Sequence, residues 1–200
     1  RGSWRSGVAS IRHRALVGET FIVGALYVTR YAAEERFPTS EGLREYRAEL
    51  VEAGLRLEGD QYISLAHTVR AGAAIARRRL EASLERPAAS QGVEDVATEA
   101  AAWVQDAWRP SDDWQVEIGA RGESFGPHRR ISPRVLARWS AVAGRLHVRA
   151  GAGRQTEAGL RLPDPGPAVP AVASARWLLA GRGAPPAEAW QAGGGVEWAP

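Results

Sequence analysis

Apolar residues recur every three or four positions over most of the chain, a spacing typical of amphipathic helices. It predicts helices over residues 11–36, 40–53, 68–86, 93–108 and 132–144. In the second of these, Leu43, Tyr46, Leu50 and Ala53 form the apolar stripe. Gly54 follows at a position where helices commonly end in a left-handed residue.

Strict alternation of apolar and polar residues, the pattern of a half-buried strand, is confined to a few short segments. Leu55 and Leu57 alternate with charged residues, and residues 62–65 return after a turn at Gly59-Asp60. A second hairpin is expected at residues 146–162, with its turn at 150–153, and a single strand at 114–118. The predicted fold class is therefore mainly α with short β-hairpins.

One order of elements appears twice: a helix, a break, a capped helix and a two-stranded hairpin, at residues 11–65 and 93–162. This is the order of a winged helix, so we expect tandem winged-helix (helix-turn-helix plus wing) domains. The expected divisions are a first winged-helix domain at 1–88, a second, arginine-rich one at 89–163, and a Pro/Gly/Trp-rich tail at 164–200.

Positive charge is concentrated in the second expected domain. The 200-residue chain has a net charge of only +3, yet residues 129–154 hold seven arginines and no acid. Such a local excess indicates a polyanionic partner, although a solvated basic face is the plainer alternative. The expected contacts to double-stranded DNA are Arg129, Arg130, Arg134, Arg138, Arg145, Arg149 and Arg154.

The expected helix 40–53 has the opposite character, with four glutamates against two arginines. An acidic helix is unsuited to the phosphate-lined groove of DNA, so this one is expected to face a protein or a second copy of the chain. The expected partner-binding residues are Glu41, Arg44, Glu45 and Glu49, with Trp177 in the tail as a docking residue.

Catalytic and metal-binding patterns are absent from the sequence. Cysteine is absent, and the four histidines stand at no spacing that suggests a metal site. The glycine-rich residues 151–154 lack the lysine that a phosphate-binding loop requires. We therefore expect no enzymatic activity, no metal and no cofactor.

Membrane segments are not expected either. The longest apolar run, Phe21 to Val28, has eight residues, whereas a membrane-spanning helix needs about 20. The N-terminal residues lack the charged-then-apolar order of a signal peptide. The sequence predicts a soluble, cytoplasmic, nucleoid-associated protein without membrane contact.

Residues 13–65 resemble the first winged helix of the kite family, the MukE-like subunits of SMC complexes of the condensin and plasmid-defence type. The matching positions are Leu16, Gly18, Phe21-Ile22, Glu45-Tyr46, Ala53-Gly54-Leu55 and Tyr62-Ile63-Ser64-Leu65. The resemblance implies a homodimeric, non-catalytic adaptor that binds a kleisin and helps an SMC ATPase act on DNA in chromosome condensation or plasmid defence.

Two other classes fit the same sequence. A stand-alone winged-helix transcription regulator or replication initiator would bind one duplex sequence tightly by itself. A viral or phage structural connector would use the tryptophan-rich tail as a docking strap and show no preference for DNA.

Overall fold

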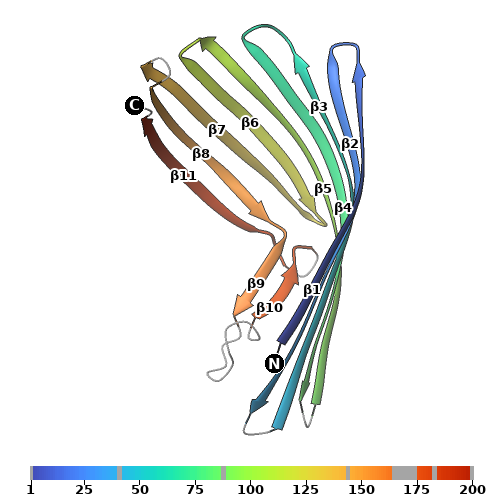
Figure 1. Cartoon of the computed structure of the whole chain (residues 1–200). Coiled ribbons are helices and arrows are strands. Elements are labelled where there is room, and N and C mark those ends of the chain that lie inside the picture. Colours follow the sequence, from blue (N-terminus) through green and yellow to red (C-terminus); the bar gives the residue numbers. More distant parts are fainter. Residues whose placement is uncertain are drawn as a thin grey trace.

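A computed structural model gives the fold of the chain and describes residues 2–39, 42–86, 89–142, 145–163, 175–181 and 184–198. The described residues are almost entirely β-strand (Figure 1). The strands are β1 (Gly2–Val17), β2 (Thr20–Thr39), β3 (Gly42–Tyr62), β4 (His67–Arg86), β5 (Ala89–Ser111), β6 (Trp114–Phe125), β7 (His128–Val142), β8 (Leu146–Glu157), β9 (Gly159–Pro163), β10 (Ala175–Leu179) and β11 (Ala187–Trp198).

Nine of these strands form one antiparallel sheet in the order β1-β2-β3-β4-β5-β6-β7-β8-β11. From β1 to β8, successive strands pair with their neighbours in sequence, as in a meander with hairpin connections, and β11 pairs with β8 after the β9–β10 insertion. Its strands are long: β2 to β5 each have 20 to 23 residues. The sheet curves strongly, and its edge strands β1 and β11 do not pair with each other (Figure 1).

Tight turns at both ends of the sheet connect the strands. Gly18-Glu19 joins β1 to β2, and Gly126-Pro127 joins β6 to β7. Both glycines have a positive φ, 61° and 59°, and they occupy the first central position, where a type II′ hairpin turn requires glycine. We call the end of the sheet where β1 connects to β2, β3 to β4, β5 to β6 and β7 to β8 the tryptophan end, and the opposite one the far end.

The hairpin of β9 and β10 lies between β8 and β11 in sequence and folds against the concave side of the sheet (Figure 1). Leu179 of β10 packs on Leu80 of β4 and Ala97 of β5, with Leu50 beside them. This cluster is small, and the described residues place no second layer of secondary structure on the convex side. We call the side that β10 covers the inner face and the opposite side the outer face.

The predicted fold class, the winged-helix domains and the MukE resemblance are wrong, because the segments expected to be helices are strands. Residues 11–36 fall in β1 and β2, and the described parts of 40–53, 68–86, 93–108 and 132–144 fall in β3, β4, β5 and β7. The physical reason is that a spacing of four residues returns to the same side of a helix and also of a strand. Ala76, Leu80 and Leu84 satisfy both periods.

Four of the expected strand segments are strands. Leu55 and Leu57 lie in β3 and residues 114–118 in β6, and the two arms of the second expected hairpin, 146–148 and 160–162, lie in β8 and β9. The hairpin turns, however, were misplaced: β3 continues through Gly59-Asp60 to Tyr62, and β8 continues through residues 150–153 to Glu157. Those glycines lie within strands.

The expected domain boundary at 88/89 falls between β4 and β5, which are paired from His67↔Trp108 to Arg86↔Ala89. Residues 164–174 of the expected tail lie outside the described residues, whereas 175–179 form β10 and 187–198 form β11 at the edge of the sheet. Among the described residues, no helix is long and apolar enough to cross a membrane.

Candidate functional site

The two faces of the sheet differ in chemistry, and the strand registers assign each residue to one of them. Residues directly opposite in neighbouring strands share a face, and successive residues alternate. Leu80 pairs with Leu50 and Asp95, so the even residues of β3 and β4 and the odd residues of β5 face inward. The remaining registers extend this assignment from β1 to β11.

The outer face carries an apolar band over the half of the sheet next to the tryptophan end. Its large members are 43–57% exposed, which is far more than packing in a core would leave. They include Leu26 and Val28 on β2, Leu55 and Leu57 on β3, Ile75 on β4, Val104 on β5, Ile118 on β6 and Val135 on β7. Polar interruptions include His13 and Asp106.

Tryptophans border this band at one end. Trp108, Trp114, Trp139 and Trp198 all face outward where their strands meet the turns of the tryptophan end. Trp114 stacks on Trp139 with ring centroids 5.8 Å apart, and His67 stacks on Trp108 at 6.1 Å. The Asp106 carboxylate is 2.7 Å from Nδ1 of His67, so the carboxylate nearest to this row has a partner.

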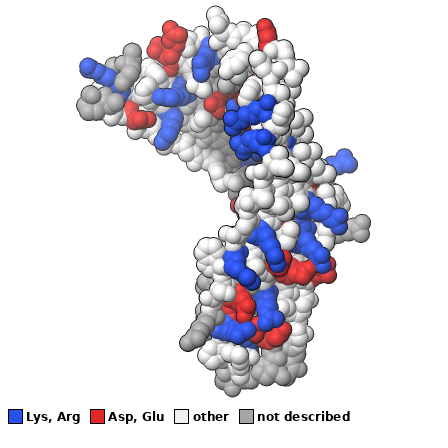
Figure 2. All heavy atoms as spheres, turned by 45° about the vertical axis from the view of Figure 1, so that its right-hand side comes forward, with Lys and Arg blue, Asp and Glu red and all other residues white. Residues whose placement is uncertain are grey.

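Charged residues border the band on its other side. Further along the strands, away from the tryptophan end, outward-facing residues are charged. They are Arg30 on β2, Glu49 on β3, Arg77 and Arg79 on β4, and Glu94 on β5. We call these residues the charged belt. Arg30 forms a two-bond pair with Glu49, each bond 2.9 Å long. Figure 2 shows basic and acidic side chains intermingled over the lower part of the molecule, toward the far end.

Ion pairing favours the ionised form of Glu49 in the charged belt. The hydrogen bond from Arg30 lowers the pKa of Glu49 below its ordinary value, and the charges of Arg30, Arg79 and Arg5 act in the same direction. Arg79 also lies 3.0 Å from Glu94. The belt is therefore a layer of matched charges and is well suited to water.

The inner face carries paired charges both opposite the apolar band, where Arg56 pairs with Glu58, and at the level of the outward Arg77 and Arg79. Arg78 of β4 pairs with Glu52 of β3 and Glu99 of β5, and the Tyr27 hydroxyl donates to Glu52 at 2.8 Å. Arg121 of β6 extends this ladder to Glu99 and Glu123. These paired charges cross four neighbouring strands, β3 to β6, so their charge is compensated locally.

An aromatic ring stands within this polar face. Trp103 of β5 has the guanidinium of Arg56 4.6 Å from its ring centroid and that of Arg121 5.1 Å away. Gly72 lies directly opposite Trp103 on β4, and a Cβ there would come within 2.4 Å of the indole. The glycine therefore makes room for the ring.

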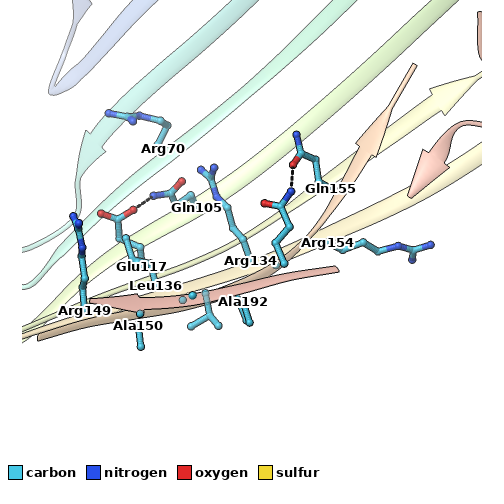
Figure 3. A pocket seen from close by; sticks show the side chains of 17 residues that line it. Arg70, Gln105, Glu117, Arg134, Leu136, Arg149, Ala150, Arg154, Gln155 and Ala192 are labelled. Carbon is cyan, nitrogen blue, oxygen red and sulfur yellow. Dashed lines mark hydrogen bonds between the residues drawn. The ribbon is translucent and has the colours of Figure 1, made fainter. Parts of the chain in front are cut away.

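A hollow of about 1040 Å³ opens on the inner face over β7, β8 and β11. Its rim holds Arg70, Arg134 and Arg149, together with Glu117 and Gln105 (Figure 3). Figure 3 shows Arg134, Arg149 and Glu117 on one side of the strands, with Ala150 on the other. We call this feature the arginine hollow.

The structure divides the seven arginines expected to bind DNA. Arg134, Arg138 and Arg149 face inward, and Arg138 and Arg149 are directly opposite each other on β7 and β8. Arg129 is exposed near the far end, and Arg145 is exposed in the turn at the tryptophan end. Arg130 and Arg154 both pair with Glu188 of β11. No helix presents them to a groove, because β7 replaces the expected recognition helix.

The residues expected to bind a protein partner are also distributed between the faces. Both glutamates face outward: Glu49 lies in the charged belt and pairs with Arg30, and Glu45 lies nearer the far end and pairs with Arg36 and Arg47. Arg44 lies on the opposite side of the same strand. Trp177 is in β10, and Glu41 lies outside the described residues.

Sequence reasoning missed the features that define the two faces. Along β6 and β7 the tryptophan falls on outward positions and most charges on inward ones, with period two, and that signal was present in the sequence. Among the described residues, no group of three or more His, Cys, Asp or Glu side chains could hold a metal ion.

No known protein family and no curated protein matches the chain in sequence. Among solved structures, the siderophore receptor PirA from Acinetobacter baumannii is similar over 100% of this chain, with a TM-score of 0.54 and 10% identity. The siderophore receptor PirA from Pseudomonas aeruginosa is similar over 98%, with a TM-score of 0.50 and 13% identity. The likeness is one of fold.

This chain spans 41% and 44% of the length of those two receptor chains. Their fold overturns four further expectations. The adaptor function, the DNA-binding and winged-helix character, the kleisin and DNA partners with no membrane contact, and the cytoplasmic location are all wrong, because the described residues form an all-β sheet whose fold is similar to that of siderophore receptors.

Proposed function

We propose that this chain forms part of the wall of a transmembrane β-barrel in an outer membrane, and that the barrel is a non-enzymatic receptor for a siderophore. The observation that carries the proposal is the contrast between the faces. An apolar band, bordered by tryptophans on one side and matched charges on the other, lies opposite a polar inner face.

The dimensions of the band support a membrane span. On β7, the outward residues from Ile131 to Trp139 are apolar over nine residues. On β11, Trp190 to Trp198 cover the same length. A tilted strand crosses the hydrocarbon core in about 9–11 residues, and aromatic residues concentrate where the strand meets the head groups.

The charged belt fixes where the membrane ends. Charged residues on the lipid-facing side are costly at the bilayer centre and harmless in water, so the belt must lie outside the hydrocarbon. Strands β2 to β5 continue for several residues beyond Arg30, Glu49 and Arg79, so their far ends would project from the membrane into water.

The open edges of the sheet require further strands. Unpaired backbone groups of β1 and β11 cannot face lipid, because nothing in the hydrocarbon can accept or donate their hydrogen bonds. Additional strands must therefore pair with both edges and close the barrel. The receptor activity rests on the similar structures, both of which are siderophore receptors.

Site-directed spin labelling tests the orientation of the two faces, and the absence of cysteine makes single-cysteine variants straightforward. The full-length protein, reconstituted in lipid vesicles, would carry a label at Ile118→Cys or Val135→Cys. The matched controls are their inward neighbours, Glu117→Cys and Leu136→Cys.

We expect the labels at 118 and 135 to be relaxed by oxygen, which concentrates in lipid, and those at 117 and 136 by a water-soluble nickel complex. An additional label at Arg79→Cys should be accessible to nickel, since it lies in the charged belt. Equal accessibility of neighbouring positions would contradict the proposal.

A further inference from the structure

The inner face of β7 and β8 holds three arginines that have no carboxylate partner among the described residues. They are Arg134 and Arg138 on β7 and Arg149 on β8, and all three are exposed. Arg138 and Arg149 stand directly opposite each other, and like charges in that arrangement destabilise a sheet. On the neighbouring part of the inner face, by contrast, carboxylates pair with Arg56, Arg70, Arg78 and Arg121.

Two carboxylates line the same region. Glu117 of β6 lies at the rim of the arginine hollow and accepts hydrogen bonds from Gln105 at 2.6 Å and from Gln115 at 3.2 Å. Glu197 of β11 borders a smaller hollow of about 260 Å³, which adjoins the first and contains Arg138. Three guanidinium groups therefore face two carboxylates.

The carboxylate of Glu188 does not remove this surplus. Both Arg130 and Arg154 pair with it, so one negative charge serves two arginines. Arg70, which also lines the arginine hollow, is neutralised by Asp60, with Nε 2.6 Å from the carboxylate. The inner wall of β7, β8 and β11 is therefore positively charged overall and would attract an anion.

An apolar side chain lies among these charges. Leu136 stands between Arg134 and Arg138 on the inward side of β7, and 44% of its surface is exposed. Among the described residues of β6, β7 and β8, it is the one large apolar side chain exposed on the inner face. It lines both hollows, as Arg149 does. An apolar group could therefore be covered here beside a bound negative charge.

Glycines keep the space around Leu136 and Arg149 open (Figure 3). Gly151 is directly opposite Leu136, and a Cβ there would lie 3.0 Å from the leucine side chain. Gly195 is directly opposite Arg149, and a Cβ there would lie 3.3 Å from Nε. At Gly193 a Cβ would meet nothing within 4 Å. A flat group can therefore approach the backbone next to both side chains.

We propose that this wall binds a small organic anion whose charged group is attached to an apolar body. Arg138 and Arg149 hold the charged group from two neighbouring strands, and Arg134 adds a third positive charge. The apolar body lies against Leu136, over the glycines of β8 and β11. This inference rests on the proposed barrel, in which the inner face lines a water-filled interior.

Isothermal titration calorimetry on the full-length protein in detergent micelles tests the proposal with phenyl phosphate as the probe. Methyl phosphate has the same charged group without the ring, and phenol has the ring without the charge. The first variant is Arg138→Gln with Arg149→Gln. Its control is Arg77→Gln with Arg129→Gln, which makes the same change in net charge at two exposed arginines of the outer face.

We expect the inner double variant to weaken phenyl phosphate and methyl phosphate by at least about tenfold, since a hydrogen bond between charged groups is worth at least that much. The outer double variant should bind both like the parent. Phenol should bind more weakly than phenyl phosphate to the parent protein, because it leaves the arginines without an anion.

Leu136→Ser tests the apolar contact independently of the charges. Phenyl phosphate should bind the parent at least about fivefold more tightly than methyl phosphate, because the ring covers apolar surface. In Leu136→Ser this preference should disappear, with the affinity for methyl phosphate unchanged. Val135→Ser is the matched control, since the neighbouring residue faces outward, and it should keep the preference.

Absence of phenyl phosphate binding to the parent protein, or equal losses in the inner and outer double variants, would overturn the assignment. A ring preference that survives in Leu136→Ser would refute the apolar contact. Spin-label accessibility in vesicles is measured on the same protein, so the two proposals fail separately. Normal alternation of accessibility without phenyl phosphate binding refutes only the anion site, whereas loss of alternation refutes the barrel.

Discussion

Arg30 and Glu49 show how single residues of the charged belt are matched. They lie on neighbouring strands and are exposed, so their attraction is screened by water and is worth little to stability. Their value lies in keeping Glu49 ionised beside a row of glutamates, since Glu81 is directly opposite it on β4.

Replacing Arg30 by glutamine is expected to raise the pKa of Glu49 toward its ordinary value, because the hydrogen bond that lowers it is lost. A depressed carboxyl pKa contributes stability above the ordinary pKa, and that contribution is lost as the pH falls through the depressed value. Carboxyl chemical shifts measured against pH report the change. Arg77→Gln is the control, and an unchanged Glu49 pKa in Arg30→Gln would contradict the assignment.

At the scale of elements, glycine inside a strand marks places where neighbouring side chains need room. Gly72 on β4 is the clearest case, because a Cβ would lie 2.4 Å from Cζ2 of Trp103 and 2.7 Å from the Leu57 carbonyl oxygen. The Leu57 carbonyl belongs to the backbone, so it cannot turn away from a new methyl group as a flexible side chain can.

Gly72→Ala is therefore expected to displace the Trp103 indole from between Arg56 and Arg121 and to lower the free energy of unfolding by about 1–3 kcal/mol. Urea unfolding measures the loss of stability, and tryptophan fluorescence reports the displaced indole. Trp103→Phe identifies the part of the fluorescence that comes from Trp103. Gly7→Ala is a matched control, because its Cβ would meet nothing within 4 Å. Equal stability of both alanine variants would show that the close approach is not real.

At the scale of the whole molecule, the sheet separates two environments. The outer face has no cover among the described residues, and the inner face holds the buried residues Leu80, Ala97 and Phe125. This asymmetry predicts different tolerance for charge at neighbouring positions of one strand.

Val135→Arg is expected to lower the free energy of unfolding from lipid vesicles, and so to destabilise the protein, by about 2–4 kcal/mol, because position 135 lies in the apolar band. Leu136→Arg, one residue away on the inner face, should cost less than about 1 kcal/mol. Urea titration of tryptophan emission in vesicles compares them. A larger cost at 136 than at 135 would reverse the assignment of the faces.

The sequence correctly indicated a strand at 114–118, because Trp114, Val116 and Ile118 alternate without ambiguity. It failed for β4, where Ala76, Leu80 and Leu84 satisfy the helical and the strand periods equally. The three consecutive arginines 77–79 did not distinguish a strand from a helix in the sequence. In the strand, Arg78 faces inward and pairs with Glu52 and Glu99, and its two neighbours face outward.

The candidate site was partly visible in advance. The arginine excess at 129–154 was evident, but its assignment to faces depended on strand pairing. Gln105, which lines the arginine hollow, gave no signal at all, because its burial and its orientation depend on Glu117 of the neighbouring strand.

The sequence by itself determined the inventory: long segments with apolar residues at even spacings, a local arginine excess, and no cysteine. Only the tertiary structure decided between helix and strand, because lateral hydrogen bonds to neighbouring strands, which no local pattern records, settle that choice. It also decided which side is inner, since the curvature of the sheet and the β9–β10 hairpin place the polar residues on the concave face and the apolar band on the convex one.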